Sequence, residues 1–132
     1  MIVLSVIAVL SCVLIPYLSH AHAQAQLRAC EGNIKNMATA IETMAAKHGN
    51  YMPPGGNGFM SWHREIMNYL GKMPSCPSCG KHYGMEFSQD FDAYTIYCGS
   101  SEVSHAACGL EKGYPQYSSV IGIVEHPRTD SM

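Results

Sequence analysis

The sequence carries little charge, and neither sign is in large excess. Its 132 residues have a net charge of −2, and the seven histidines are scattered along the chain. Proteins that bind nucleic acids cluster Lys and Arg to neutralise phosphates. This chain has no such basic patch, so we expect no nucleic-acid partner. Its length allows one modest domain with a small core.

The sequence also lacks a recognisable catalytic set. Ser61 and His63 are two positions apart, so on a helix they point to different faces. Cys30 and His48 are separated by about five helical turns. The stretch "SHAHA" (Ser19–Ala23) offers two histidines without a third metal ligand. We therefore expect a protein that is not an enzyme.

The first segment, Met1–Leu18, contains no charged residue, and Ser5 and Ser11 are its only polar ones. As a helix it would be about 27 Å long, against a bilayer core of roughly 30 Å. A secretory signal peptide normally begins with Lys or Arg, and none occurs before Arg28. Pro16 is expected to kink the helix, which a membrane tolerates. The segment is predicted to be a transmembrane helix that is retained.

The helical pattern continues beyond the apolar run. Large apolar residues recur at steps of three and four, which predicts one buried stripe on a helix. Lys47 and His48, followed by Gly49, are a suitable helix end. We divide the chain into a transmembrane helix (1–23), an amphipathic continuation (24–48) and a globular domain (49–132). The stripe that packs the helix on that domain is Leu27, Ile34, Met37, Ile41 and Met44.

The remainder of the chain has shorter elements. A proline- and glycine-rich loop follows Gly49, and a short helix is expected from Ser61 to Leu70, ended by Gly71. Residues 83–87 and 92–98 read as two strands joined by a turn. A short apolar run occupies Val120–Val124. The predicted fold class is α+β, with a long N-terminal helix packed on a small antiparallel sheet.

Four of the six cysteines lie after residue 75. Such a density indicates an oxidising compartment with disulfides, or a metal site. The motif "CPSCG" resembles half of a zinc ribbon, but no second Cys-x-x-Cys follows at the usual distance. A zinc set is conceivable in which a histidine, His82 or His105, joins Cys76, Cys79 and Cys98. Four cysteines allow three disulfide connectivities, and the sequence does not choose among them.

The order of these features resembles the type IV pilin-like proteins, and most closely the pseudopilins of type II secretion systems. The resemblance rests on "VIAVLSCVLIPYLSHAHAQAQLRACEGNIKNMATAIETMAAKHGNYMP" (Val6–Pro53), which is similar to the family's N-terminal helix. The later motifs "CP", "DAYTIYC" and "YPQYSSVIGIVEHP" are similar to a C-terminal pattern found in some members. The resemblance covers nearly the whole chain and depends on the order and spacing of these motifs rather than on any single one.

The resemblance implies a structural subunit, a pilin or pseudopilin. Such a subunit waits in the bacterial inner membrane as a single-pass protein, with its C-terminal domain in the periplasm or on the cell surface. Its implied partners are lipid, an inner-membrane assembly platform, copies of itself and other pilin-like subunits. The resemblance also implies disulfides that pair Cys76 with Cys98 and Cys79 with Cys108. Some relatives bind calcium in a C-terminal loop, where this chain has Asp90 and Asp92.

One departure from the family concerns the first residues. Family members have a basic leader ending in glycine, and then a glutamate that pairs with the methylated N-terminal amine of a neighbouring subunit. Neither feature occurs in this sequence, and we expect the true start to lie upstream of Met1 or the gene to be truncated. The alternative is a small secreted binding domain, stabilised by disulfides or zinc and released by cleavage after Ala23.

Overall fold

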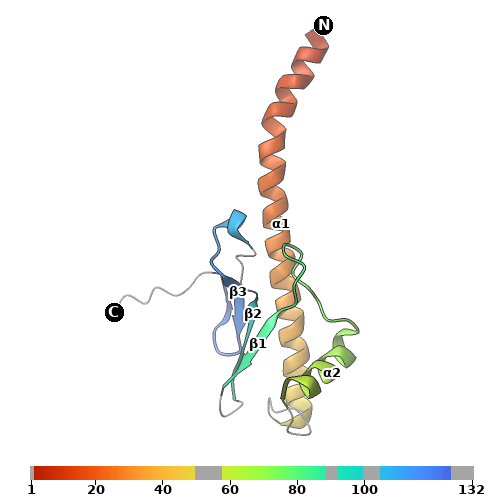
Figure 1. The fold of residues 1–132 in the computed structure, drawn as a ribbon, viewed down its shortest axis with the longest axis vertical. Helices are drawn as coiled ribbons and strands as arrows, with labels where there is room; N and C mark the ends of the chain where they lie inside the picture. Colours follow the sequence, from red (N-terminus) through yellow and green to blue (C-terminus); the bar gives the residue numbers. More distant parts are fainter. Residues whose placement is uncertain (1, 50–57, 89–91, 100–104, 126–132) are drawn as a thin grey trace, which may run out of the picture.

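The computed structural model of the protein describes residues 2–49, 58–88, 92–99 and 105–125. Figure 1 shows a long helix whose first half projects from a small domain, while its second half lies beside a sheet. The predicted α+β class is confirmed. In chain order the elements are α1 (Ile2–His48), α2 (Gly58–Leu70), β1 (Gly84–Phe87), β2 (Tyr94–Cys98), η1 (Ala106–Cys108), β3 (Gly113–Ser118) and β4 (Gly122–Val124).

Helix α1 is continuous from the apolar run into the amphipathic segment, as the sequence pattern predicts. It passes through Pro16 without a break, and the first half of α1 is gently curved in Figure 1. Long helices commonly curve in this way. The helix ends where Gly49 adopts a φ of +83° and donates its N–H to the carbonyl oxygen of Ala45 at 2.7 Å.

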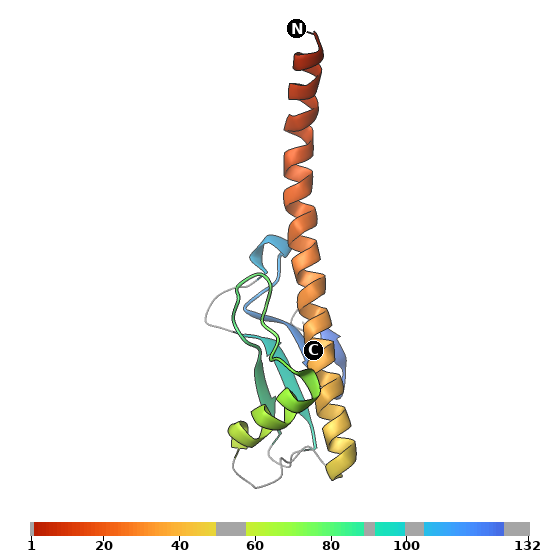
Figure 2. The ribbon, with the colours of Figure 1, turned by 90° about the vertical axis from the view of Figure 1, so that its right-hand side faces the viewer.

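The core lies between the second half of α1 and the sheet, with α2 covering the lower end in Figure 2. The stripe of α1 is buried throughout. Leu27, Ile34, Met37, Ile41 and Met44 each expose 2% or less of their surface. From the other elements, the core receives Ile66 of α2 and Tyr94, Ile96 and Cys98 of β2. The alternating burial along β2 places these last three on one face of the strand, as expected for a half-buried strand.

The sheet is an antiparallel meander in the order β1-β2-β3-β4. Strands β1 and β2 fall where the sequence predicts them. The run Val120–Val124, in contrast, is divided between a turn and strand β4, which pairs with β3. Val120 and Ile121 lie in that turn and are 78% and 49% exposed. Strand β3 was not anticipated, because Pro115 and the flanking polar residues obscure the strand pattern.

Helix α2 begins earlier than its expected start at Ser61. It starts at Gly58, so Ser61 lies inside the first turns instead of capping them. Its end at Leu70 is as predicted, with Gly71 at a φ of +69°. The sequence signal for the start was ambiguous because Ser61 is an acceptable cap and equally an acceptable residue within a first turn.

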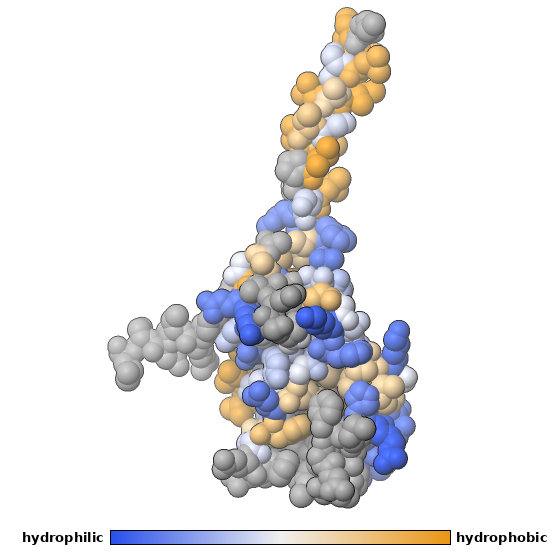
Figure 3. Space-filling model, in the orientation of Figure 1, coloured by the Kyte–Doolittle hydropathy of each residue, from blue (hydrophilic) through white to orange (hydrophobic). Residues whose placement is uncertain are grey.

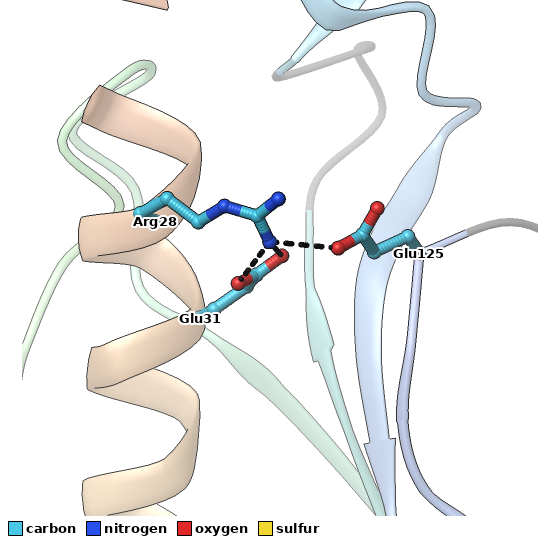
Figure 4. A network of polar contacts seen from close by, with 3 residues as sticks. All are labelled: Arg28, Glu31 and Glu125. Carbon is cyan, nitrogen blue, oxygen red and sulfur yellow. Dashed lines mark hydrogen bonds and ion pairs between the residues drawn. The ribbon is translucent and has the colours of Figure 1, made fainter. Parts of the chain in front are cut away.

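One ion pair of Arg28 connects α1 to Glu125, the residue after β4, and a second lies within α1 (Figure 4). Arg28 Nη1 lies 2.9 Å from Glu31 Oε2 and 2.8 Å from Glu125 Oε1. The bond to Glu31 and then that to Glu125 raise the pKa of Arg28. Glu31 is buried, with only 8% of its side chain exposed. Arg28 therefore supplies the positive charge that a nearly buried carboxylate requires.

The ring of Tyr97 covers two glycines on the sheet. Tyr97 pairs with Gly84 across β1 and β2, and a Cβ built on Gly84 would collide with the Tyr97 ring. A Cβ on Gly99 would meet the same ring. In contrast, Gly32 on α1 has open space where its Cβ would be. Replacement by alanine is therefore predicted to have opposite effects on stability at Gly84 and at Gly32.

We expect Gly84→Ala to destabilise the protein by about 1 kcal/mol, because the Tyr97 ring must move aside. Gly32→Ala should stabilise it by about 0.5–1 kcal/mol through helix propensity. Chemical unfolding of both variants in mild detergent measures these values. In a double-mutant cycle with Tyr97→Ala, the penalty of Gly84→Ala should disappear. A penalty that persists without the ring would show that the collision is not its cause.

Candidate functional site

The first half of α1 presents a mainly apolar surface on the face seen in Figure 3 (orange). Its large aliphatic side chains are between 51% and 82% exposed, and none of the strongest apolar window is buried. By length and composition this helix can cross a membrane. The eleven exposed aliphatic side chains are Ile2, Val3, Leu4, Val6, Ile7, Val9, Leu10, Val13, Leu14, Ile15 and Leu18. We call this segment, Ile2–Leu18, the apolar stalk.

The two serines of the apolar stalk satisfy their own hydroxyl groups. Ser5 Oγ donates to the carbonyl oxygen of Ile2 at 2.7 Å, and Ser11 Oγ donates to that of Ile7 at 2.8 Å. An unsatisfied hydroxyl in hydrocarbon would cost several kcal/mol. Because both hydroxyl groups are bonded within the helix, neither serine presents an unpaired donor to lipid or to an apolar protein neighbour.

A second candidate site lies inside the domain, where three cysteines and one histidine meet. The Sγ atoms of Cys30, Cys76 and Cys98 and a ring nitrogen of His105 all lie within 4.8 Å of one another. His105 Nε2 is 3.4 Å from Cys76 Sγ and 3.6 Å from Cys98 Sγ. Each of the four residues exposes 3% or less of its surface. We call this group the Cys₃His cluster.

Four different elements supply the cluster. Cys30 comes from the buried stripe of α1, and Cys98 from the last position of β2, where the pairing with β3 shifts register between Tyr97 and Cys98. Such bulges re-aim side chains at the edge of a ladder. His105 precedes η1, and Cys76 lies in the loop before β1. The cluster therefore holds together segments that are far apart in the sequence.

The "CPSCG" motif forms a tight turn around Cys76. The N–H of Gly80 donates to the carbonyl oxygen of Cys76 at 2.7 Å, and the N–H of Cys76 donates to that of Lys81 at 2.9 Å. Gly80 has a φ of +71°, a conformation that favours glycine. The backbone of Ser78 and Cys79 also hydrogen-bonds the Cys76 sulfur. These two bonds favour the thiolate form of Cys76.

Without a metal, burial is the largest influence on the pKa values of Cys76 and His105. It raises the pKa of Cys76 to about 11, against the smaller opposing effect of the Cys79 and Ser78 backbone. Burial also lowers the pKa of His105. The pKa of Tyr83 is raised, first by burial and then by the adjacent Cys30 thiol. Without a metal, Cys76 therefore keeps its thiol proton and His105 is an uncharged imidazole near neutral pH.

The structure changes one member of the zinc set that the sequence suggested. Cys76, Cys98 and His105 come together as proposed, but Cys79 is outside the group and Cys30 takes its place. His82, the other histidine considered, is exposed, and its Nδ1 lies 3.4 Å from the carbonyl oxygen of Pro74. Cys30 replaces Cys79 for a geometric reason. The tight turn of "CPSCG" directs Cys76 but not Cys79 into the group, and α1 places Cys30 at the same point.

The two disulfides implied by the resemblance are not formed. None of the six cysteines, each of which the structure describes, forms a disulfide. Cys76 and Cys98 are neighbours within the Cys₃His cluster, whereas Cys79 and Cys108 lie outside it and are half-buried. The calcium candidates gain no ligand set. Asp90 lies outside the described residues, and Asp92 accepts a hydrogen bond from Ser88 Oγ at 2.6 Å within its own turn.

Cys30 is the functional residue that sequence reasoning missed. It falls on the buried stripe of α1, where a cysteine is expected to behave as a small apolar residue. The sequence offers one indication of its role. Cys30 lies near the start of the buried stripe, and the cysteines after residue 75 do not form a complete zinc-ribbon motif by themselves. Only the packing of α1 on the sheet reveals that this position faces Cys76 and Cys98.

The described architecture, a long N-terminal helix packed on a small antiparallel sheet, is compatible with a pilin-like fold. Comparisons of the chain with protein-family models, with curated proteins and with solved structures find no match. The assignment to pilin-like proteins therefore stays a resemblance, and the functional argument rests on the apolar stalk and the domain that carries it.

Proposed function

We propose that this protein is a structural subunit, a pilin or pseudopilin, of a bacterial type II secretion or type IV pilus-like filament. The observation that carries the proposal is the apolar stalk, which projects from the domain (Figure 1) and whose large aliphatic side chains are all more than half exposed. A surface of this kind is not stable in water. It requires lipid or other apolar helices around it.

The proposed life of the subunit has two states, and the stalk avoids water in both. Before assembly it spans the bacterial inner membrane, with the C-terminal domain in the periplasm or at the cell surface. After transfer by the assembly platform it packs against stalks of other subunits. Moving from lipid to a packed helical core carries little hydrophobic penalty, so close packing decides the outcome. Small residues such as Ala8, Ser11 and Cys12 allow that close approach.

The continuity of α1 supports this proposal. The helix passes from the stalk through the polar segment Ser19–Gln26 into the buried stripe without interruption. The domain is thereby fixed to the stalk by a single rigid element and by the ion pairs of Arg28. A rigid connection would allow packing of the stalks to set the positions of the domains. We propose this as a mechanical role without catalysis.

A secreted domain is the second candidate, and one observation favours it. The buried stripe begins at Leu27, so cleavage after Ala23 would leave the core of the domain intact. The released product would begin at Gln24 and would be soluble. The membrane-bound and secreted forms therefore differ in their N-terminus and in the fraction where they are found.

The filament proposal predicts that stalks of neighbouring subunits touch. A photo-reactive benzophenone amino acid at Val9, which is 65% exposed, should give a ladder of covalent multimers on irradiation of intact native cells. Electrophoresis with detection of this chain reads out the ladder. The matched control is the same variant in cells that lack the assembly motor, where only monomer and lipid adducts should form.

Two outcomes would contradict the filament proposal. If the motor-containing cells also give only monomer and lipid adducts, the stalk is an anchor and does not pack with other stalks. If the chain is found in the soluble fraction with Gln24 at its N-terminus, the secreted domain is the correct function.

A further inference from the structure

We propose that Cys30, Cys76, Cys98 and His105 bind one structural zinc ion. This site is independent of filament assembly, because none of the four ligands lies in the apolar stalk. Three thiolates and one imidazole are the donor set that zinc accepts in closed structural sites. The donors come from α1, the loop before β1, the end of β2 and the residue before η1.

The spacing of the donors fits a tetrahedral ion. With Zn–S near 2.3 Å and Zn–N near 2.0 Å, a tetrahedral site separates a sulfur from a nitrogen by about 3.6 Å. His105 Nε2 lies 3.4 Å and 3.6 Å from the sulfur atoms of Cys76 and Cys98. All four donor atoms fall within 4.8 Å of one another. A single ion can therefore contact all of them after small shifts.

The site is closed rather than catalytic. Four protein ligands complete the coordination of zinc, whereas catalytic sites keep one position for water. The ligands are between 0% and 3% exposed, so the geometry leaves no path for a substrate. The surrounding groups also suit bound thiolates. The Ser78 and Cys79 backbone hydrogen-bonds the Cys76 sulfur, and Tyr83, next to Cys30, accepts a hydrogen bond from Asn33.

Metal binding would release protons and tie the domain to the helix. Zn²⁺ would replace the three thiol protons, which pass to solvent, and would bind neutral His105 through Nε2, the ring nitrogen that faces the sulfur atoms. One ion would then connect α1 to three segments of the domain. A disulfide could join only two of these segments and would leave the third cysteine unpaired.

The first test is the metal content of the full-length chain, purified in mild detergent without a histidine tag or chelator. Elemental analysis should find one zinc per chain. Exchange for Co²⁺ should give thiolate-to-cobalt charge-transfer absorption and the intense visible bands of a tetrahedral site. Removing zinc with a strong chelator should lower the melting temperature by about 10 °C or more, because a ligand of the folded state is lost. Metal-free protein with six free thiols would overturn the proposal.

Variants identify the ligands, and the chain supplies its own controls. Cys30→Ser and Cys98→Ser should lose zinc, whereas Cys79→Ser and Cys108→Ser should keep one zinc per chain. His105→Ala should lose the ion, but His105→Cys should retain it with stronger charge-transfer absorption, because it restores a fourth donor. This rescue separates loss of a ligand from misfolding. Retention of zinc in Cys30→Ser together with its loss in Cys79→Ser would overturn the assignment.

Oxidation is the remaining alternative. The intact mass of the freshly purified chain should equal that of six reduced cysteines, and alkylation should modify the cluster cysteines only after zinc is removed. A mass lower by two hydrogens, with a peptide that links two of Cys30, Cys76 and Cys98, would overturn the proposal. Both results can be read whether or not the subunit assembles into filaments, so failure here would leave the filament proposal standing.

Discussion

Placing charge at the centre of the apolar stalk should release the protein from membranes. We expect Leu10→Arg to weaken membrane association measurably, and Leu10→Arg combined with Val13→Arg to move most of the chain into the soluble or aggregated fraction. Leu10 and Val13 are 58% and 69% exposed, so neither change disturbs the core of the domain. The effect would arise entirely from the transfer of the stalk into lipid.

The magnitudes explain why two charges are needed. The eleven aliphatic side chains of the stalk contribute roughly 0.3–0.6 kcal/mol each to insertion, or about 3–7 kcal/mol together. One arginine near the helix centre costs about 2.5–3.5 kcal/mol, which removes about half of that gain. Two arginines would cost about as much as the whole insertion free energy of the stalk. A graded response is therefore expected rather than an all-or-none loss.

Fractionation of cells, with an alkaline carbonate wash of the membranes, measures the bound fraction. Two control variants separate charge in the stalk from charge elsewhere. Leu10→Ile keeps the stalk apolar and should remain membrane-bound. Val120→Arg adds the same charge at a position that is 78% exposed in the domain, and it should also remain bound. If the double variant pellets with membranes as fully as Val120→Arg does, the stalk is not the anchor.

The long helix could be predicted because its signal is repetitive. The charge-free run up to Leu18 and the stripe from Leu27 to Met44 each depend on many residues, so one ambiguous position does not alter the outcome. The buried face follows from periodicity alone. The ends of α2 and the division of Val120–Val124 into turn and strand depend on single residues, and there the prediction failed or was incomplete.

The cysteine cluster was predictable only in part, for a different reason. Cys76 and Cys98 stand out in the sequence because "CPSCG" resembles half of a zinc ribbon and Cys98 follows at a suitable distance. The sequence pattern wrongly favours Cys79 over Cys30, because the choice between them depends on how α1 docks against the loop before β1. That docking includes contacts between residues more than forty positions apart, such as the hydrogen bond that Asn33 Nδ2 donates to the Ser75 carbonyl oxygen. Local pattern carries no information about such contacts.

Truncating the centre of the core should cause the largest loss of stability. We expect Ile96→Ala to reduce the free energy of unfolding by about 2–5 kcal/mol. Ile96 is fully buried on the core face of β2. It belongs to the hydrophobic core that also contains Tyr94 and the buried stripe of α1. The loss combines the transfer energy of the deleted methyl groups with the cavity that they leave. The free energy of unfolding of a native protein is only about 5–15 kcal/mol in total, so the variant would lose much of its stability.

Ile121→Ala provides a control with the same chemical change. Ile121 lies in the turn between β3 and β4 and is 49% exposed, so its truncation should shift stability by no more than about 0.5 kcal/mol. Chemical unfolding in mild detergent at a fixed zinc concentration compares the two midpoints at constant slope. The fixed zinc matters because Cys98, two residues from Ile96, belongs to the Cys₃His cluster. Equal shifts for the two variants would show that β2 does not pack as described, and the position of Cys98 would then lose its support as well.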